Sequence, residues 1–122
     1  MPQNNLTKAL PAVRLAIGLG AYALPELTGK IFGFDTENQE TKYMARLFGI
    51  RDVILGAGVL ASSGDARKLW WRLGIVADAG DAGAGYMGLK SGAPKRAMIM
   101  STLTALSAVG MGIAGAGALG GE

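Results

Sequence analysis

The sequence predicts an all-α fold, a four-helix transmembrane bundle that forms a single integral membrane domain over residues 1–122. The chain has room for one domain, 50% of its residues are hydrophobic, and only 17% are charged, against about 25% in soluble domains. Its apolar residues fall into four stretches of about 18–23 residues, the length that a helix needs to cross a bilayer. Most polar residues lie between these stretches, so a soluble bundle would expose largely aliphatic helix faces to water.

The first predicted helix covers residues 8–28 and contains the apolar stretch from Leu10 to Leu27. Arg14 lies within about two turns of the membrane surface, so its side chain either extends to that surface or turns inward. A cleaved signal peptide is the alternative for this segment. Lys8 and Arg14 precede an apolar run, and Ala21-Tyr22-Ala23 has the small residues of a cleavage site.

The second predicted helix covers residues 39–62 and the third covers residues 67–90. Thr36 and Gln39 have the spacing of a capping box at the start of the second helix. Asp65 is the expected cap of the third helix. A short polar turn joins the two helices, so they are expected to be antiparallel neighbours.

The fourth predicted helix covers residues 95–119 and has no charged side chain from Ala97 to Leu119, which makes it the clearest membrane span. The segment from Ser91 to Pro94 is a predicted turn, because Gly92 can end one helix and Pro94 can start the next. Four spans place both termini on one side of the membrane. Lys and Arg are divided almost equally between the two sides, so they do not fix the orientation.

Several glycine triplets have the spacing of a dinucleotide-binding loop, beginning at Gly83, Gly110 and Gly115. None of them follows a β-strand, which such a loop requires, so we expect no nucleotide site. A series of small residues predicts instead a close-packing face on the fourth helix, either for the bundle core or for a dimer contact. These residues are Ala108, Gly112, Ala116 and Gly120.

Charged residues occupy the middle of the second and third helices, where each costs about 2.5–3.5 kcal/mol if it faces lipid. They are Arg51 and Asp52 on one helix and Asp78 and Asp81 on the other. We expect them to face one another or a polar pocket, with Arg14 as a fifth candidate. At 100° per residue, one stripe of the third helix collects Gly74, Asp78, Asp81, Gly85 and Gly88.

This polar cluster has a structural and a functional interpretation. In the first, Arg51 pairs with Asp78 or Asp81 and joins two helices. In the second, three carboxylates share one central guanidinium, or two if Arg14 turns inward. At least one carboxylate would then keep its proton and could serve as a general acid or in a proton relay. A continuous ion pathway is a third interpretation, disfavoured by the few polar residues in the first and fourth helices.

The composition excludes several kinds of chemistry. The chain has Cys 0 and His 0, so it cannot form disulfides, thiolate or imidazole metal sites, His-ligated haem, or a Ser–His or Cys–His nucleophile pair. We predict no metal and no cofactor. The net charge of +3 comes without basic clusters, which argues against nucleic-acid binding.

The run from Arg46 to Gly56 (RLFGIRDVILG), followed by Asp78 and Asp81, resembles small four-helix membrane proteins of actinobacteria within the broader DoxX/DoxD-like set. The resemblance extends over most of the chain through Gly88. It implies a four-helix transmembrane bundle. Some DoxX-like proteins are linked to quinone or thiosulfate oxidation and to membrane oxidoreductase complexes. It supplies no catalytic residues to carry over.

We therefore expect a multi-pass protein of the cell membrane that serves as an accessory, interaction or lipophilic-ligand-binding subunit. Its expected partners are the lipid bilayer, a lipophilic small molecule or quinone, and another membrane protein or a second copy. The alternative is an intramembrane acid–base enzyme, of the isomerase, cyclase or epoxide hydrolase type, acting on a lipophilic substrate. The catalytic residues of such an enzyme are unknown. The candidate site residues are Arg14, Arg51, Asp52, Asp78 and Asp81.

Overall fold

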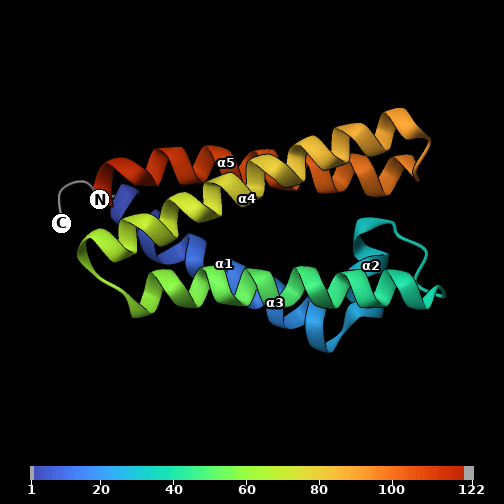
Figure 1. The fold of residues 1–122 in the computed structure, drawn as a ribbon, viewed down its shortest axis with the longest axis horizontal. Coiled ribbons are helices and arrows are strands. Elements are labelled where there is room, and N and C mark those ends of the chain that lie inside the picture. Colours follow the sequence, from blue (N-terminus) through green and yellow to red (C-terminus); the bar gives the residue numbers. More distant parts are fainter. Residues whose placement is uncertain (1, 120–122) are drawn as a thin grey trace.

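A computed structural model describes residues 2–119, and in this part of the chain every regular element is a helix. The predicted all-α class is therefore confirmed, with five helices in place of the expected four. The start of the first helix and the end of the last helix lie at the same end of the bundle (Figure 1). The helices are α1 (Pro2–Ala23), α2 (Pro25–Phe32), α3 (Gln39–Ala61), α4 (Gly64–Ser91) and α5 (Lys95–Leu119).

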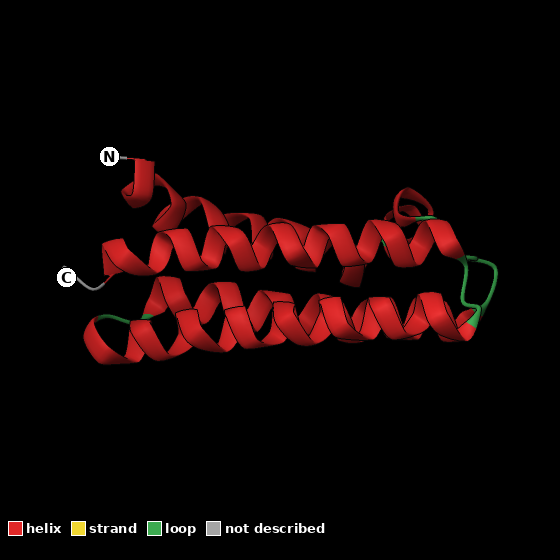
Figure 2. Cartoon of the chain, turned by 90° about the horizontal axis from the view of Figure 1, so that it is seen from above, coloured by secondary structure: helices red, strands yellow, loops and turns green. Residues whose placement is uncertain are grey.

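The four long helices associate as two pairs, with α1 against α3 and α4 against α5. Less extensive contacts between α1 and α5 and between α3 and α4 join the pairs into a closed ring. Figures 1 and 2 show these helices running along the long axis of the molecule. Consequently α1 and α4 lie on a diagonal of the bundle, and a side chain that joins them must cross its centre.

Glycine allows the backbones of α1 and α3 to touch. A Cβ atom added at Gly18 would lie 2.6 Å from the carbonyl oxygen of Gly49, and one added at Gly49 would lie 2.5 Å from that of Gly18. Farther along, a Cβ at Gly56 would lie 2.7 Å from the Pro11 oxygen. Small residues at such contacts are typical of closely packed membrane helices.

The contact between α4 and α5 is different, because large side chains of α4 fit against glycines of α5. A Cβ at Gly112 would lie 2.6 Å from Ile75, and one at Gly115 would lie 2.6 Å from Trp71. The indole Nε1 of Trp71 donates a hydrogen bond to the Gly112 oxygen at 2.7 Å. This contact satisfies the polar end of a buried ring.

The predicted close-packing face of the last helix is only partly correct. Gly112 is buried and Ala108 is half-buried, whereas Ala116 is exposed. Gly120 lies outside the described residues. Gly115 faces inward in place of Ala116, and the ring of Trp71 on α4 packs against it.

The first apolar stretch does not form one helix over residues 8–28. It breaks at Leu24, and α2 is bent by 113° relative to α1. Pro25 explains the break, because it has no backbone N–H to donate and its ring clashes with the carbonyl four residues earlier. The apolar character of the stretch continues through this proline, and hydropathy alone therefore did not reveal the bend.

Two predicted helix caps are wrong and one predicted turn is correct. Asn38 caps α3 by accepting a hydrogen bond from the Glu40 N–H at 2.8 Å, so the capping box of Thr36 and Gln39 does not form. Helix α4 begins at Gly64, which places Asp65 in its first turn. Gly92 ends α4 in the left-handed conformation with φ 88°, as the expected turn requires.

Three charged side chains in the middle of the helices are buried, whereas many large apolar side chains lie on the outer surface of the bundle. Arg14, Asp52 and Asp78 are only 6%, 5% and 6% exposed. Large apolar residues are exposed along every helix, including Val13, Leu19, Leu27, Ile31, Leu47, Ile54, Leu73, Val76, Leu103, Leu106 and Ile113. By length and composition, residues 95–117 of α5 could cross a membrane, and α1 with α2 could form a second, broken span.

Candidate functional site

The guanidinium of Arg14 crosses the bundle from α1 to a carboxylate on α4. Its Nη1 donates to Oδ1 of Asp78 at 3.1 Å, and its Nη2 donates to Oδ2 at 2.5 Å. Both side chains are 8% exposed. Two parallel charge-assisted hydrogen bonds of this kind fix both the position and the orientation of the arginine.

Gly74 makes this crossing possible. It lies one turn before Asp78 on α4, and a Cβ atom there would lie 2.8 Å from Nη2 of Arg14. The sequence places both residues on one stripe of this helix, and in the structure both are buried. The glycine thus provides the space that the guanidinium occupies.

Asp52 on α3 is the second carboxylate beside Arg14. Its Oδ1 lies 3.6 Å from Nη1 of Arg14, and its side chain is 8% exposed. Arg14, Asp52 and Asp78 together form what we call the inner cluster. With one guanidinium and two carboxylates, it carries an excess of one negative charge if all three groups are ionised.

Arg51 and Asp81 form a separate pair, called here the outer pair, which joins α3 to α4. Nη1 and Nη2 of Arg51 donate to the two carboxylate oxygens of Asp81 at 3.1 and 2.6 Å. The guanidinium also lies 5.2 Å from the ring centre of Phe48, a cation–π distance. These side chains are 41% and 31% exposed, far more than those of the inner cluster.

All five residues singled out from the sequence lie near the midpoints of their helices, where they form two neighbouring groups. The arginines differ from the expectation, because Arg14 occupies the centre while Arg51 lies at the edge. Arg51 pairs with Asp81, one of its two predicted partners. The other predicted partner, Asp78, is bound to Arg14.

Little space is available beside the inner cluster. A pocket of about 10 Å³ lies next to Arg14, lined by Leu10, Pro11, Val59, Trp70, Trp71 and Gly74. That volume accommodates about one water molecule. Within residues 2–119, no group of three or more His, Cys, Asp or Glu side chains is arranged to hold a metal ion.

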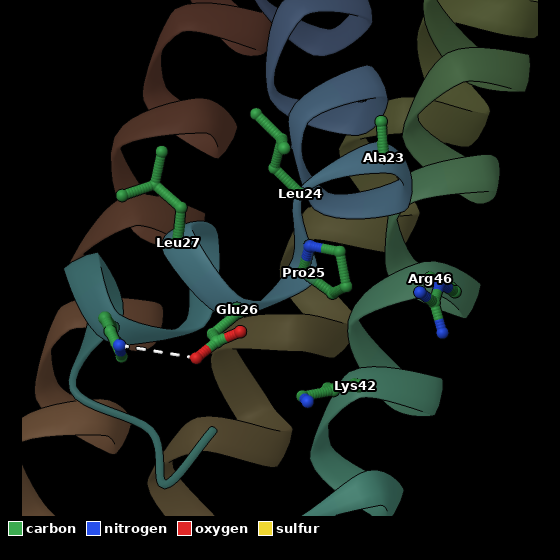
Figure 3. Close-up of a pocket in the computed structure, with 8 residues that line it drawn as sticks. Ala23, Leu24, Pro25, Glu26, Leu27, Lys42 and Arg46 are labelled. Carbon is green, nitrogen blue, oxygen red and sulfur yellow. Dashed lines mark ion pairs between the residues drawn. The ribbon is translucent and has the colours of Figure 1, made fainter. Parts of the chain in front are cut away.

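A larger pocket lies away from these charges, at the bend between α1 and α2 and the first turns of α3 (Figure 3). Its volume is about 430 Å³. The sequence analysis did not identify it, because the predicted continuous helix over residues 8–28 leaves no bend. Pro25 was the signal that could have revealed it.

Comparisons with known protein families, with curated proteins and with solved structures find no match for this chain. The resemblance to the DoxX/DoxD-like set therefore stays a prediction from the sequence.

Proposed function

We propose that the chain is a multi-pass membrane protein whose four long helices all cross the bilayer. One observation carries this proposal, namely the burial of Arg14, Asp52 and Asp78 inside a bundle whose outer surface is largely aliphatic. In water this arrangement would expose apolar surface and bury charge, both at a cost. In lipid the exposed aliphatic side chains are solvated and the charges are shielded from the acyl chains.

Within the membrane, we propose a structural role for the inner cluster. Its hydrogen bonds join α1 of one helix pair to α4 of the other, at the centre of the bundle. The acid–base enzyme receives less support from the geometry. Asp78 and Asp81 each accept two hydrogen bonds from an arginine, and the space beside Arg14 is too small for a lipophilic substrate.

The accessory role that we propose includes self-association through the surface around the outer pair, whose side chains are 41% and 31% exposed. A half-exposed ion pair at the middle of a membrane helix is costly unless protein covers it. An Arg–Asp pair is self-complementary about a two-fold axis, because the guanidinium of each copy meets the carboxylate of the other. Gly80, next to Asp81, has nothing within 4 Å of an added Cβ atom, so a second backbone can approach there.

Cysteine labelling tests the membrane placement, since the chain has Cys 0. Single variants Ser63→Cys, Ser91→Cys and Val76→Cys place a thiol just before α4, at its last residue and at its exposed middle. In sealed vesicles, we expect a membrane-impermeant maleimide to label the Ser63→Cys and Ser91→Cys variants from opposite sides and to leave the Val76→Cys variant unlabelled. Recovery of the protein without detergent, or rapid labelling at position 76, would refute the proposal.

Oxidative cross-linking tests the self-association. We expect the Ala84→Cys variant, one turn after Asp81 on the exposed side of α4, to form a disulfide-linked dimer in membranes. The Ile113→Cys variant on α5 is the matched control and should stay monomeric. Equal cross-linking of both variants, or a monomer in native mass spectrometry of the solubilised protein, would contradict this contact.

A further inference from the structure

We propose that the pocket at the bend between α1 and α2 binds the phosphate headgroup of an anionic phospholipid. This inference rests on the proposed membrane placement and assigns a ligand class to a site that the polar cluster does not include. The pocket has a volume of about 430 Å³, within the usual range for small-molecule sites. Its lining residues are Ala23, Leu24, Pro25, Glu26, Leu27, Lys30, Lys42 and Arg46.

The lining combines apolar and charged side chains, as contact with both the glycerol and the headgroup of a lipid requires. Ala23, Leu24, Pro25 and Leu27 provide an apolar surface, and Leu24 and Leu27 are 56% and 55% exposed. Figure 3 shows Lys42 and Arg46 projecting from α3, across from Glu26 at the start of α2. An amphiphile can therefore contact basic and apolar groups in the same pocket.

The charges of the pocket favour an anion. Lys30 and Glu26 form an ion pair at 3.4 Å and neutralise each other. Lys42 and Arg46, one turn apart on α3, form no ion pair with any described residue. Three cations and one carboxylate leave the pocket with two positive charges in excess.

The two cations that form no ion pair with a described residue lie on one face of α3 beside the bend. The Nε of Arg46 donates to the Tyr22 oxygen at 3.4 Å, which holds its side chain beside the end of α1. Lys42, one turn away, lines the same pocket. A phosphate in the pocket can therefore contact two cations from consecutive turns of α3.

The pocket lies at the depth where phospholipid headgroups are found. Helix α1 ends there after 22 residues, or roughly 33 Å, close to the thickness of the hydrocarbon core. The bend of 113° turns α2 out of the direction of α1 and toward the plane of the interface. Tyr22 and Tyr43 are 51% and 61% exposed at this level, as interfacial aromatic residues are.

Native mass spectrometry of the detergent-solubilised protein tests the inference. The protein is equilibrated with mixed micelles of phosphatidylglycerol and phosphatidylcholine, which share the phosphodiester but differ in net charge. We expect wild type to retain one phosphatidylglycerol in preference. The double variant Lys42→Gln/Arg46→Gln should reduce this preference by roughly tenfold or more. The control Lys90→Gln/Lys95→Gln removes the same charge at the same end of the bundle and should retain it.

Three outcomes would overturn the inference. Equal retention of both lipids by wild type would exclude an anion-selective site. An equal loss in the control would assign the effect to overall charge. Displacement of the lipid by inorganic phosphate alone, at millimolar concentration, would assign the pocket to a free anion. If the cysteine labelling still shows that α4 crosses the membrane, only the lipid site fails and the proposed membrane placement stands.

Discussion

The inner cluster and the outer pair use the same chemical groups in different surroundings. Arg14 with Asp78 and Arg51 with Asp81 both form two parallel hydrogen bonds of similar length. The inner side chains are 8% exposed, whereas the outer ones are 41% and 31% exposed. The geometry of an ion pair therefore does not reveal its importance, which depends on what surrounds a charge when its partner is removed.

The largest effect is expected for Arg14→Met. This substitution leaves Asp52 and Asp78 buried without the guanidinium that pairs with them, and breaking a buried pair in this way costs about 3–5 kcal/mol. A lower Tm in detergent and weaker expression would show it. The control is Arg14→Met/Asp78→Leu, which removes both members of the pair and should recover part of the loss. An unchanged Tm for Arg14→Met would remove the distinction between the two regions.

The next effect is expected for Gly74→Ala, which acts on the inner cluster alone. The added methyl group would lie 2.8 Å from Nη2 of Arg14 and displaces the guanidinium from Asp78. We expect a loss of about 1–3 kcal/mol, typical of overpacking. Gly110→Ala on α5, where an added Cβ atom also has nothing within 4 Å, is the control and should be neutral or slightly stabilising in the same Tm measurement.

A smaller loss, about 1 kcal/mol, is expected for Arg51→Met in the detergent-solubilised monomer, because the side chains of the outer pair are 41% and 31% exposed there and water can reach Asp81. The ratio of this loss to that of Arg14→Met measures the difference between the two regions. In the proposed dimer a second copy covers Asp81, so the loss for Arg51→Met should rise toward that for Arg14→Met. Measuring the Tm at a protein concentration at which the dimer forms and at one at which it dissociates separates the two states.

The smallest effect is expected for Asp52→Asn. The amide keeps the size of the side chain, and Arg14 keeps both hydrogen bonds to Asp78, so the loss of the Asp52 ion pair is offset by the lower cost of burying a neutral group. We therefore expect a change below about 1 kcal/mol. Asp78→Asn is the comparison, since its NH2 group cannot accept one of the two hydrogen bonds from Arg14 and its neutral oxygen accepts the other more weakly, so it should lower the Tm more. A larger loss at position 52 would mean that Asp52 is the principal partner of the arginine.

The sequence was sufficient to find the five charged residues, because helix length places Arg51, Asp52, Asp78 and Asp81 at one depth and helical periodicity places both α4 carboxylates on one face. It was not sufficient to pair them. Periodicity gives the buried face of each helix, but it does not show which helices lie side by side and which lie across the bundle from each other. That arrangement depends on the contacts of Gly18 with Gly49, and similar glycines occur throughout the chain.

The bend at Pro25 was missed for a related reason. Hydropathy follows the average composition of a stretch, and Leu24 and Leu27 keep that average apolar across the proline although Glu26 follows it directly. Backbone chemistry, the absence of an N–H on proline, decides the direction of the chain there. Because the bend was missed, the pocket that it forms with Lys42 and Arg46 was missed as well.

The indole rings give the protein an intrinsic optical probe. The chain has two tryptophans, and both line the small pocket beside Arg14. The Nε1 of Trp71 donates a hydrogen bond to the Gly112 oxygen of α5. Their emission maximum should shift to longer wavelength when solvent reaches the centre of the bundle. Opening of this centre can thus be followed in time on unlabelled protein, in detergent or in vesicles.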